Sequence, residues 1–193
     1  MGKWSVNGTL DAFGNSINDK IELIVTSATA ARYGNIGLYQ SIGSNIGIVA
    51  TNDKLNIRTS YSHTGVYNGI GTEDRSFVWT PQLVMQGGYR IAQTRTSVQF
   101  FFNRFGKISR VFEGQNGENI VRNQDAYSML DMTVNQKLWQ DKLSITTGLR
   151  NLVGVTTLSS TQISSGAHGS GGSSVTISPG RTFFISLRYA FNK

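Results

Sequence analysis

Residues 182–192, at the C-terminal end of the chain, alternate between apolar and polar side chains, and this alternation strongly limits how the chain can fold. The apolar set is Phe183, Ile185, Leu187, Tyr189 and Phe191, and the other set is Thr182, Ser186, Arg188, Ala190 and Asn192. A period of two places one set on each face of a β-strand. A strand with such an apolar, aromatic face needs either a protein partner or lipid against that face.

The same period of two recurs in seven other segments of the sequence. These are residues 4–11, 36–48, 55–62, 77–90, 98–103, 130–138 and 143–153. The first of them is expected to continue through residues 21–25 after a break at residues 15–19. The pattern therefore predicts about eight strands and no helix, with strand lengths close to what a tilted membrane-spanning strand needs.

The connections between these strands alternate in length. Short polar turns are expected near residues 51–54, 91–95 and 140–142, and long loops near residues 26–34, 68–76, 106–125 and 154–180. Short turns at one end and long loops at the other are typical of bacterial outer-membrane barrels, whose long loops are extracellular. Both termini would then lie on the periplasmic side.

Composition supports a transmembrane barrel over an ordinary globular domain. Only 38% of the residues are hydrophobic, although the chain has 10 Phe, 7 Tyr and 3 Trp, with 22 Gly and 2 Pro. Lumen-facing positions dilute the apolar content of a barrel in this way. No run approaches the roughly 18 apolar residues of a membrane helix, which excludes a helical membrane protein.

The lack of cysteine and the distribution of charge exclude some kinds of site and of binding partner for this chain. The absence of cysteine excludes disulfides and thiolate metal sites. The formal net charge is +7, but the 18 Lys and Arg are scattered, which fits an anionic membrane surface better than nucleic acid. The first residues lack the apolar core of a secretory signal, so an exported chain would be a mature form, an engineered form or a fragment.

Two sets of side chains are candidates for functional roles. Aromatic residues near the predicted strand ends could form the interfacial girdles of a barrel: Trp4, Trp79, Tyr89, Trp139, Tyr189 and Phe191. The terminal aromatic strand, with Tyr189 and Phe191, also resembles the C-terminal assembly signal of outer-membrane barrels. Charged residues on the polar parity would face a lumen: Arg58, Arg90, Asp131, Lys137 and Arg150. These charges could contact a cargo, or they could simply form a solvated wall.

Several stretches resemble a known family. Residues 127–139 followed by residues 142–155, with an aspartate-containing strand, a short turn and a strand ending in Asn151-Leu152, look like the penultimate hairpin of TonB-dependent outer-membrane receptors. Residues 180–184 in front of the last strand resemble the final strand of that family, in particular its Bacteroidota-type members. Residues 19–24 and 32–37 are similar to a middle-barrel hairpin of the same family.

This resemblance implies a role in nutrient import. Family members have an N-terminal plug and about 22 strands, so residues 1–193 would be a C-terminal portion of the barrel without a plug. The remaining barrel, the plug, outer-membrane lipid and lipopolysaccharide would be its partners, and TonB would act through the missing N-terminal part. The five lumen-parity charges would then contact the plug or an unknown nutrient. The resemblance implies no cofactor and no enzymatic activity.

Two other functions remain open. A complete barrel of about eight strands could serve a binding or structural role. An outer-membrane hydrolase could use His63, although a third catalytic group is not evident. His168 lies in a Gly- and Ser-rich segment without nearby Cys or carboxylates, which is a poor setting for a metal site.

Overall fold

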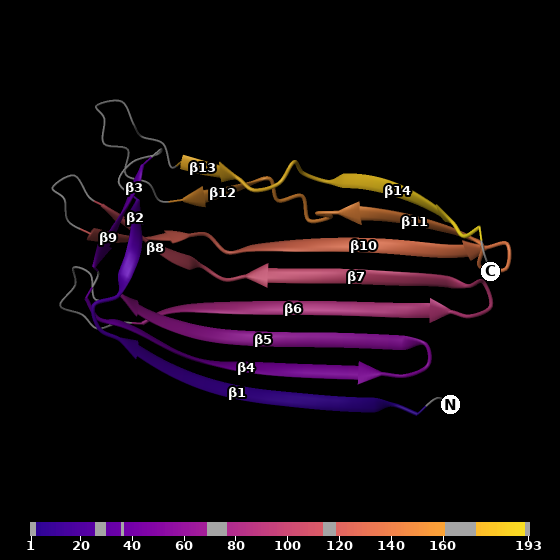
Figure 1. Ribbon diagram of the computed structural model, residues 1–193, viewed down its shortest axis with the longest axis horizontal. Helices are drawn as coiled ribbons and strands as arrows, with labels where there is room; N and C mark the ends of the chain where they lie inside the picture. The colour runs from indigo at the N-terminus through magenta and orange to yellow at the C-terminus, as the bar shows by residue number, and fades with distance from the viewer. Residues whose placement is uncertain are drawn as a thin grey trace.

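The computed structural model describes residues 3–25, 30–35, 37–68, 77–113, 119–160 and 173–191, and these residues form two antiparallel-rich β-sheets without a helix (Figure 1). The main sheet has eight strands in the order β1-β4-β5-β6-β7-β10-β11-β14. Its strands are β1 (Ser5–Ile17), β4 (Tyr39–Thr51), β5 (Leu55–Asn68), β6 (Val78–Ile91), β7 (Thr96–Phe105), β10 (Tyr127–Leu138), β11 (Leu143–Arg150) and β14 (Thr182–Tyr189). All its neighbouring strands are antiparallel, as the sequence predicts.

A second, smaller sheet lies at one end of the main sheet (Figure 1). Its strands are β2 (Ile21–Val25), β3 (Ala31–Asn35), β8 (Ile108–Glu113), β9 (Asn119–Gln124), β12 (Thr157–Ser160) and β13 (Ser173–Thr176). They pair as three hairpins, β2-β3, β8-β9 and β12-β13, and each hairpin lies within one of the long connections between strands of the main sheet. We call this end of the main sheet the loop end.

The opposite end of the main sheet carries the short turns, and we call it the turn end. The turns around residues 52–54, 92–95 and 139–142 lie there, together with both ends of the described chain (Figure 1). Backbone hydrogen bonds close these turns, for example from the Asn52 amide to the Leu55 carbonyl at 2.8 Å. The alternation of short turns and long connections predicted from the sequence is therefore confirmed.

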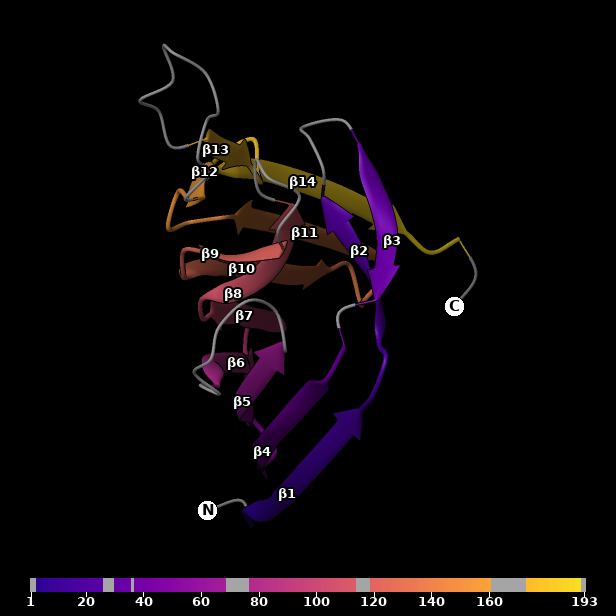
Figure 2. The same ribbon diagram turned by 90° about the vertical axis from the view of Figure 1, so that its left-hand side faces the viewer.

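The main sheet curves into an arc with β1 and β14 at its two edges (Figure 2). Within the described residues, β1 pairs only with β4 and β14 pairs only with β11. Among these residues the two edges therefore do not close on each other, and the eight strands form an open, curved sheet.

The structure corrects several of the predicted boundaries. The break expected at residues 15–19 begins later, because β1 continues to Ile17, and after it residues 21–25 form a strand of the second sheet and not a continuation of the first strand. The strand expected from residue 36 begins at Tyr39, and the one expected to reach residue 153 ends at Arg150. Three of the long connections contain strands where loops were expected, because short hairpins can pair with one another beyond the end of the main sheet.

The apolar side chains of the main sheet are largely uncovered. Tyr67 and Leu158 are the buried hydrophobic residues of the described chain, whereas Leu10 and Leu187 are 75% and 68% exposed. A soluble sandwich or a ligand-binding barrel would bury these rows inside. The observed arrangement is that of a sheet whose apolar face needs a non-aqueous environment.

In the described part of the chain, no helix is long and apolar enough to cross a bilayer.

Candidate functional site

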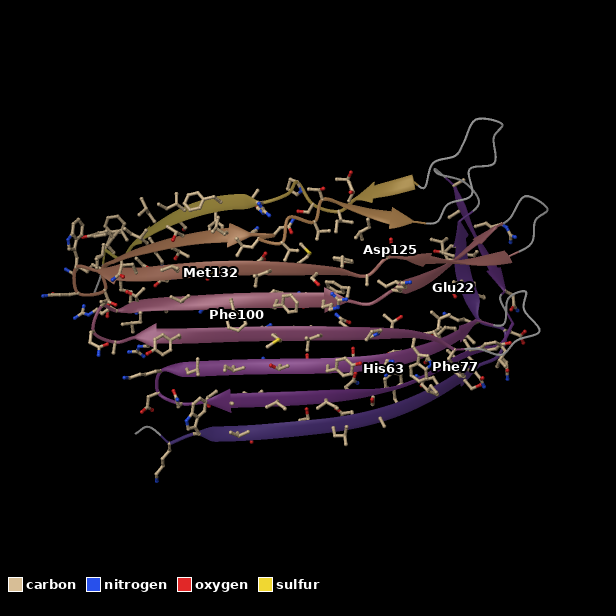
Figure 3. All side chains as sticks on the ribbon, turned by 180° about the vertical axis from the view of Figure 1, so that it is seen from behind. Glu22, His63, Phe77, Phe100, Asp125 and Met132 are labelled. Carbon is tan, nitrogen blue, oxygen red and sulfur yellow. The ribbon has the colours of Figure 1, made fainter. Side chains whose placement is uncertain are left out.

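Charge is divided unequally between the two faces of the main sheet. The strand register places seven charged residues on one face: Asp11, Arg58, Arg90, Asp131, Lys137, Arg150 and Arg188. Of the charged residues in these eight strands, Arg104 alone lies on the other face, where it pairs with Leu83 and Ser128. We call these the polar face and the apolar face. Phe100 and Met132, which oppose each other on β7 and β10, belong to the apolar face (Figure 3).

Aromatic side chains mark both ends of the apolar face. On β6, Trp79 lies near the loop end and Tyr89 near the turn end, ten residues apart, with only Pro81, Leu83, Met85 and Gly87 between them on that face. At ~3.3 Å per residue and a tilt of ~40°, ten residues span about 25 Å in height. This matches the apolar band of about 25 Å that outer-membrane barrels present to lipid.

The predicted girdle residues fall into these two groups. Trp79 belongs to the loop end, where its ring lies 4.6 Å from His63 and 6.2 Å from Phe77. His63 and Phe77 are labelled in Figure 3. Trp139 lies in the turn after β10 and is 70% exposed, and Tyr189 ends β14 with Phe191 edge-on at 4.9 Å. These aromatics therefore lie at two levels of the sheet, and their role as an interfacial girdle stays a prediction.

A hollow of about 620 Å³ opens in the middle of the polar face. Amide and hydroxyl side chains from β5, β6, β7 and β10 line it: Asn56, Gln86, Gln99 and Thr133. Two of the predicted site residues, Asp131 and Arg150, also line it, together with the rings of Phe101 and Phe184. This hollow offers hydrogen-bonding groups of both signs beside flat apolar surfaces, and it is the candidate binding site of the chain.

On the side of the hollow formed by β11 and β14, the position of the Phe184 ring depends on Gly148. The Phe184 ring lies across Gly148 so closely that a Cβ at position 148 would overlap the ring. The Arg150 guanidinium lies over the same ring, 5.1 Å from its centroid, which is a cation–π arrangement. Gly148 therefore lets an aromatic side chain lie flat on the polar face and hold Arg150 in place.

Asp131 has a structural contact inside this site. Its Oδ1 accepts a hydrogen bond of 2.8 Å from the backbone N–H of Asn151, which directly follows β11. Asn151 is 2% exposed, and its side-chain Nδ2 donates to the Val155 carbonyl at 2.7 Å and to the Ser178 Oγ at 3.0 Å. Asp131 thus fixes the turn after β11, in addition to any contact that it makes with a ligand.

A second hollow, of about 380 Å³, lies at the turn end of the polar face. Arg90 and Lys137, both singled out from the sequence, line it with Arg95 and Asp141. The Nη1 of Arg95 lies 3.6 Å from the Oδ1 of Asp141, which is an ion pair too long to be a hydrogen bond. The fifth predicted charge, Arg58, lies on the polar face opposite Gln86. All five predicted charges share the polar face, but they line two hollows and do not form one cluster.

The aromatic residues that line the central hollow were not predicted from the sequence. Phe101 and Phe184 lie on the polar face because each directly adjoins a phenylalanine of the opposite parity, Phe100 or Phe183. Adjacent aromatic residues in a strand place one ring on each face. The repeated Phe-Phe pairs in the sequence were the signal that could have identified these two residues.

Among the described residues, the ring contacts of His63 are with other aromatic side chains. His63 lies on the apolar face opposite Ser44 and Pro81, and its ring packs against Trp79 and, at 6.2 Å, Tyr61. A hydroxyl therefore lies on the neighbouring strand, but the ring contacts of His63 are aromatic. His168 lies outside the described residues, and within the described ranges no three His, Cys, Asp or Glu side chains group as metal ligands.

Comparisons with known proteins support the fold. No protein-family model and no curated protein matches the sequence. The solved structure of the FrpB iron transporter from Neisseria meningitidis (F3-3 variant) is similar, with a TM-score of 0.59 and 16% sequence identity. The match covers 96% of this chain, and the chain spans only 29% of that transporter. The chain therefore has the fold of part of a β-barrel wall.

Proposed function

We propose that this chain is a C-terminal wall segment of a TonB-dependent receptor in the bacterial outer membrane, and that the complete receptor imports a scarce nutrient. The wall segment supplies lumen-facing groups, the long connections at the loop end and the C-terminal strand. The rest of the barrel, a plug and TonB are the partners that the complete receptor requires. The chain itself performs no chemical reaction.

The observation that carries this proposal is the division of charge between the two faces. Seven charged side chains lie on one face and Arg104 alone on the other, which supports a sheet with one face toward water and the other toward lipid. Aromatic residues at both ends of the lipid side support an outer-membrane location. The similarity to an iron transporter supports transport as the class of function.

The free edges favour a segment of a large barrel over a complete small one. An unpaired strand edge cannot remain in hydrocarbon, because its N–H and C=O groups have no water to bind. An eight-stranded barrel would need β1 to pair with β14, and its interior would have to be filled by side chains. Instead, the polar face has an open hollow of about 620 Å³, which suits the wider lumen of a barrel with more strands.

Heat-modifiable migration of the purified 193-residue chain in detergent tests this choice. A closed eight-stranded barrel resists the detergent and migrates faster before boiling than after boiling. We expect no such fast-migrating monomer from the chain alone, since its two edge strands lack partners. A compact, detergent-resistant monomer would favour the small complete barrel with a binding or structural role.

The complete native reading frame tests the receptor assignment separately. If the chain belongs to a receptor, the frame encodes further strands and a plug before residue 1. A frame that encodes only an export signal before residue 1 would contradict the assignment. Fractionation of cells that express the frame must also place its product in the outer membrane.

A further inference from the structure

Arg104 is an exception on the apolar face of the main sheet. Its neighbours across the strands are Leu83 on β6 and Ser128 on β10, and Phe102 precedes it on the same face of β7. The side chain is exposed, so it projects from the sheet and does not insert between strands. If this face meets lipid, as the proposed function requires, a permanent positive charge projects toward the bilayer.

The described part of the protein offers the Arg104 guanidinium few hydrogen-bond or ion-pair partners. A guanidinium has five N–H donors and no acceptor. One of them, at Nη1, donates to the Ser128 Oγ at 3.3 Å. No acidic side chain in the described ranges forms an ion pair with Arg104. Because a charged group in hydrocarbon is expensive, the remaining donors need an anion or water from outside the chain.

The height of Arg104 on the sheet indicates where that partner comes from. Its neighbour Leu83 is six residues from Tyr89 and four from Trp79. With the same rise and tilt, Arg104 lies roughly 15 Å above the Tyr89 level and roughly 10 Å below Trp79. It is therefore in the half of the apolar band nearer the loop end, and its long side chain can extend toward the interface on that side.

We propose that Arg104 and Ser128 form a binding site for the phosphate of a lipid headgroup with net negative charge in the outer leaflet. Phosphate offers several acceptor oxygens, and an arginine can bind two of them with parallel N–H bonds. Ser128 aligns one edge of the guanidinium and leaves its other donors for the lipid. This proposal rests on the proposed function, because it requires the apolar face to lie in a membrane.

Local lipid quenching of a fluorescent probe can test the site. The product of the complete native reading frame is reconstituted in phosphatidylcholine vesicles, with a bimane label on a single cysteine at Met85→Cys. Met85 lies on the apolar face of β6 opposite Phe102, two residues from the partner of Arg104, and residues 1–193 contain no native cysteine. Quenching by brominated phosphatidylglycerol and by brominated phosphatidylcholine gives the relative affinity of the two lipids beside Arg104.

We expect an approximately fivefold preference for phosphatidylglycerol, since one basic side chain near an anionic surface contributes about that factor. Arg104→Gln should reduce the preference to about one, and Arg104→Lys should retain most of it. Arg188→Gln removes the same charge from the polar face, and it should leave the preference unchanged.

Each contrary result has a distinct meaning. A preference that survives Arg104→Gln, or that disappears in Arg188→Gln, overturns the site. Loss of the preference when inorganic phosphate is added to the buffer overturns the lipid as the source of the phosphate. An absence of quenching by either brominated lipid means that the apolar face does not meet lipid, and the proposed function fails with it.

Discussion

The backbone N–H of Asn151 donates a 2.8 Å hydrogen bond to the Oδ1 of Asp131, which joins the turn after β11 to the polar face of β10. A second bond of 2.7 Å, from the Leu152 amide to the Leu130 carbonyl, lies beside it. The side chain of Asp131 thus continues the β10-β11 pairing beyond the last residue of β11. A residue that sequence parity identified as a lumen charge therefore also stabilises the wall itself.

Replacing Asp131 with Ala should destabilise the folded protein by about 1–3 kcal/mol, because the buried N–H of Asn151 loses its acceptor. Asp131→Asn is the matched control, since its side-chain oxygen can still accept this bond. Urea denaturation in detergent, followed by tryptophan fluorescence, measures the difference. Equal destabilisation by the two variants would show that the charge of Asp131, and not its acceptor, is what matters.

Asn151→Ala should destabilise the folded protein more than Asp131→Ala does, by about 2–4 kcal/mol. The Asn151 side chain donates to Val155 and Ser178 and accepts from the amides of Gly154 and Val155, and its φ is +53°. Asparagine tolerates this left-handed conformation better than most residues. Asn151→Gly adopts the positive φ without strain but removes the four side-chain hydrogen bonds. Its stability in the same denaturation experiment should therefore lie between those of Asn151→Ala and the native protein. If Gly restores full stability, the hydrogen bonds contribute nothing.

Gly148→Ala should destabilise the sheet by about 1–3 kcal/mol, because the new methyl group overlaps the Phe184 ring. Combining it with Phe184→Ala should recover stability relative to the sum of the two single variants. A double-mutant cycle measures this coupling. Strict additivity would mean that the ring does not lie across Gly148.

The period of two in the sequence predicted the central strands well, and it did so for a physical reason. In β10, every apolar residue from Leu130 to Leu138 lies on the face that its parity predicts, because register and pleat leave no other choice. The period of two did not predict the end of a strand correctly where the residues on both faces are similar. At Asn15 and Ser16 the change in polarity resembled a break, yet β1 continues because β4 still provides its hydrogen-bonding partners.

The candidate site was less predictable than the strands. Parity placed Arg58, Arg90, Asp131, Lys137 and Arg150 on one face, but it could not show which of them share a hollow, because that depends on register across several strands. The contact of Asp131 with Asn151 depends on a turn of irregular backbone, which no period describes. The roles of these five charges toward a plug or a cargo remain predictions.

Arginine substitutions on opposite faces of β10 test the environment of the sheet. Met132→Arg places a charge on the apolar face, and Thr133→Arg places it one residue away on the polar face. We expect Met132→Arg to destabilise the protein in vesicles by about 1–3 kcal/mol. Met132 lies level with Gly87, two residues from Tyr89, and the cost of a basic residue falls from about 2–4 kcal/mol at the bilayer midplane toward the interfaces. Thr133→Arg should have a much smaller effect, and similar effects at both positions would contradict a lipid side.

The most direct measurement is the accessibility of spin labels along β10. Single cysteines at Leu130, Asp131, Met132, Thr133, Val134 and Asn135 are labelled in the product of the complete native reading frame and reconstituted in vesicles. We expect collisions with oxygen, which concentrates in lipid, to be frequent at Leu130, Met132 and Val134. Collisions with a water-soluble nickel chelate should be frequent at the other three positions, Asp131, Thr133 and Asn135. Labels at Leu130, Met132 and Val134 that are shielded from oxygen, or exposed to nickel, would contradict an outer-membrane barrel wall.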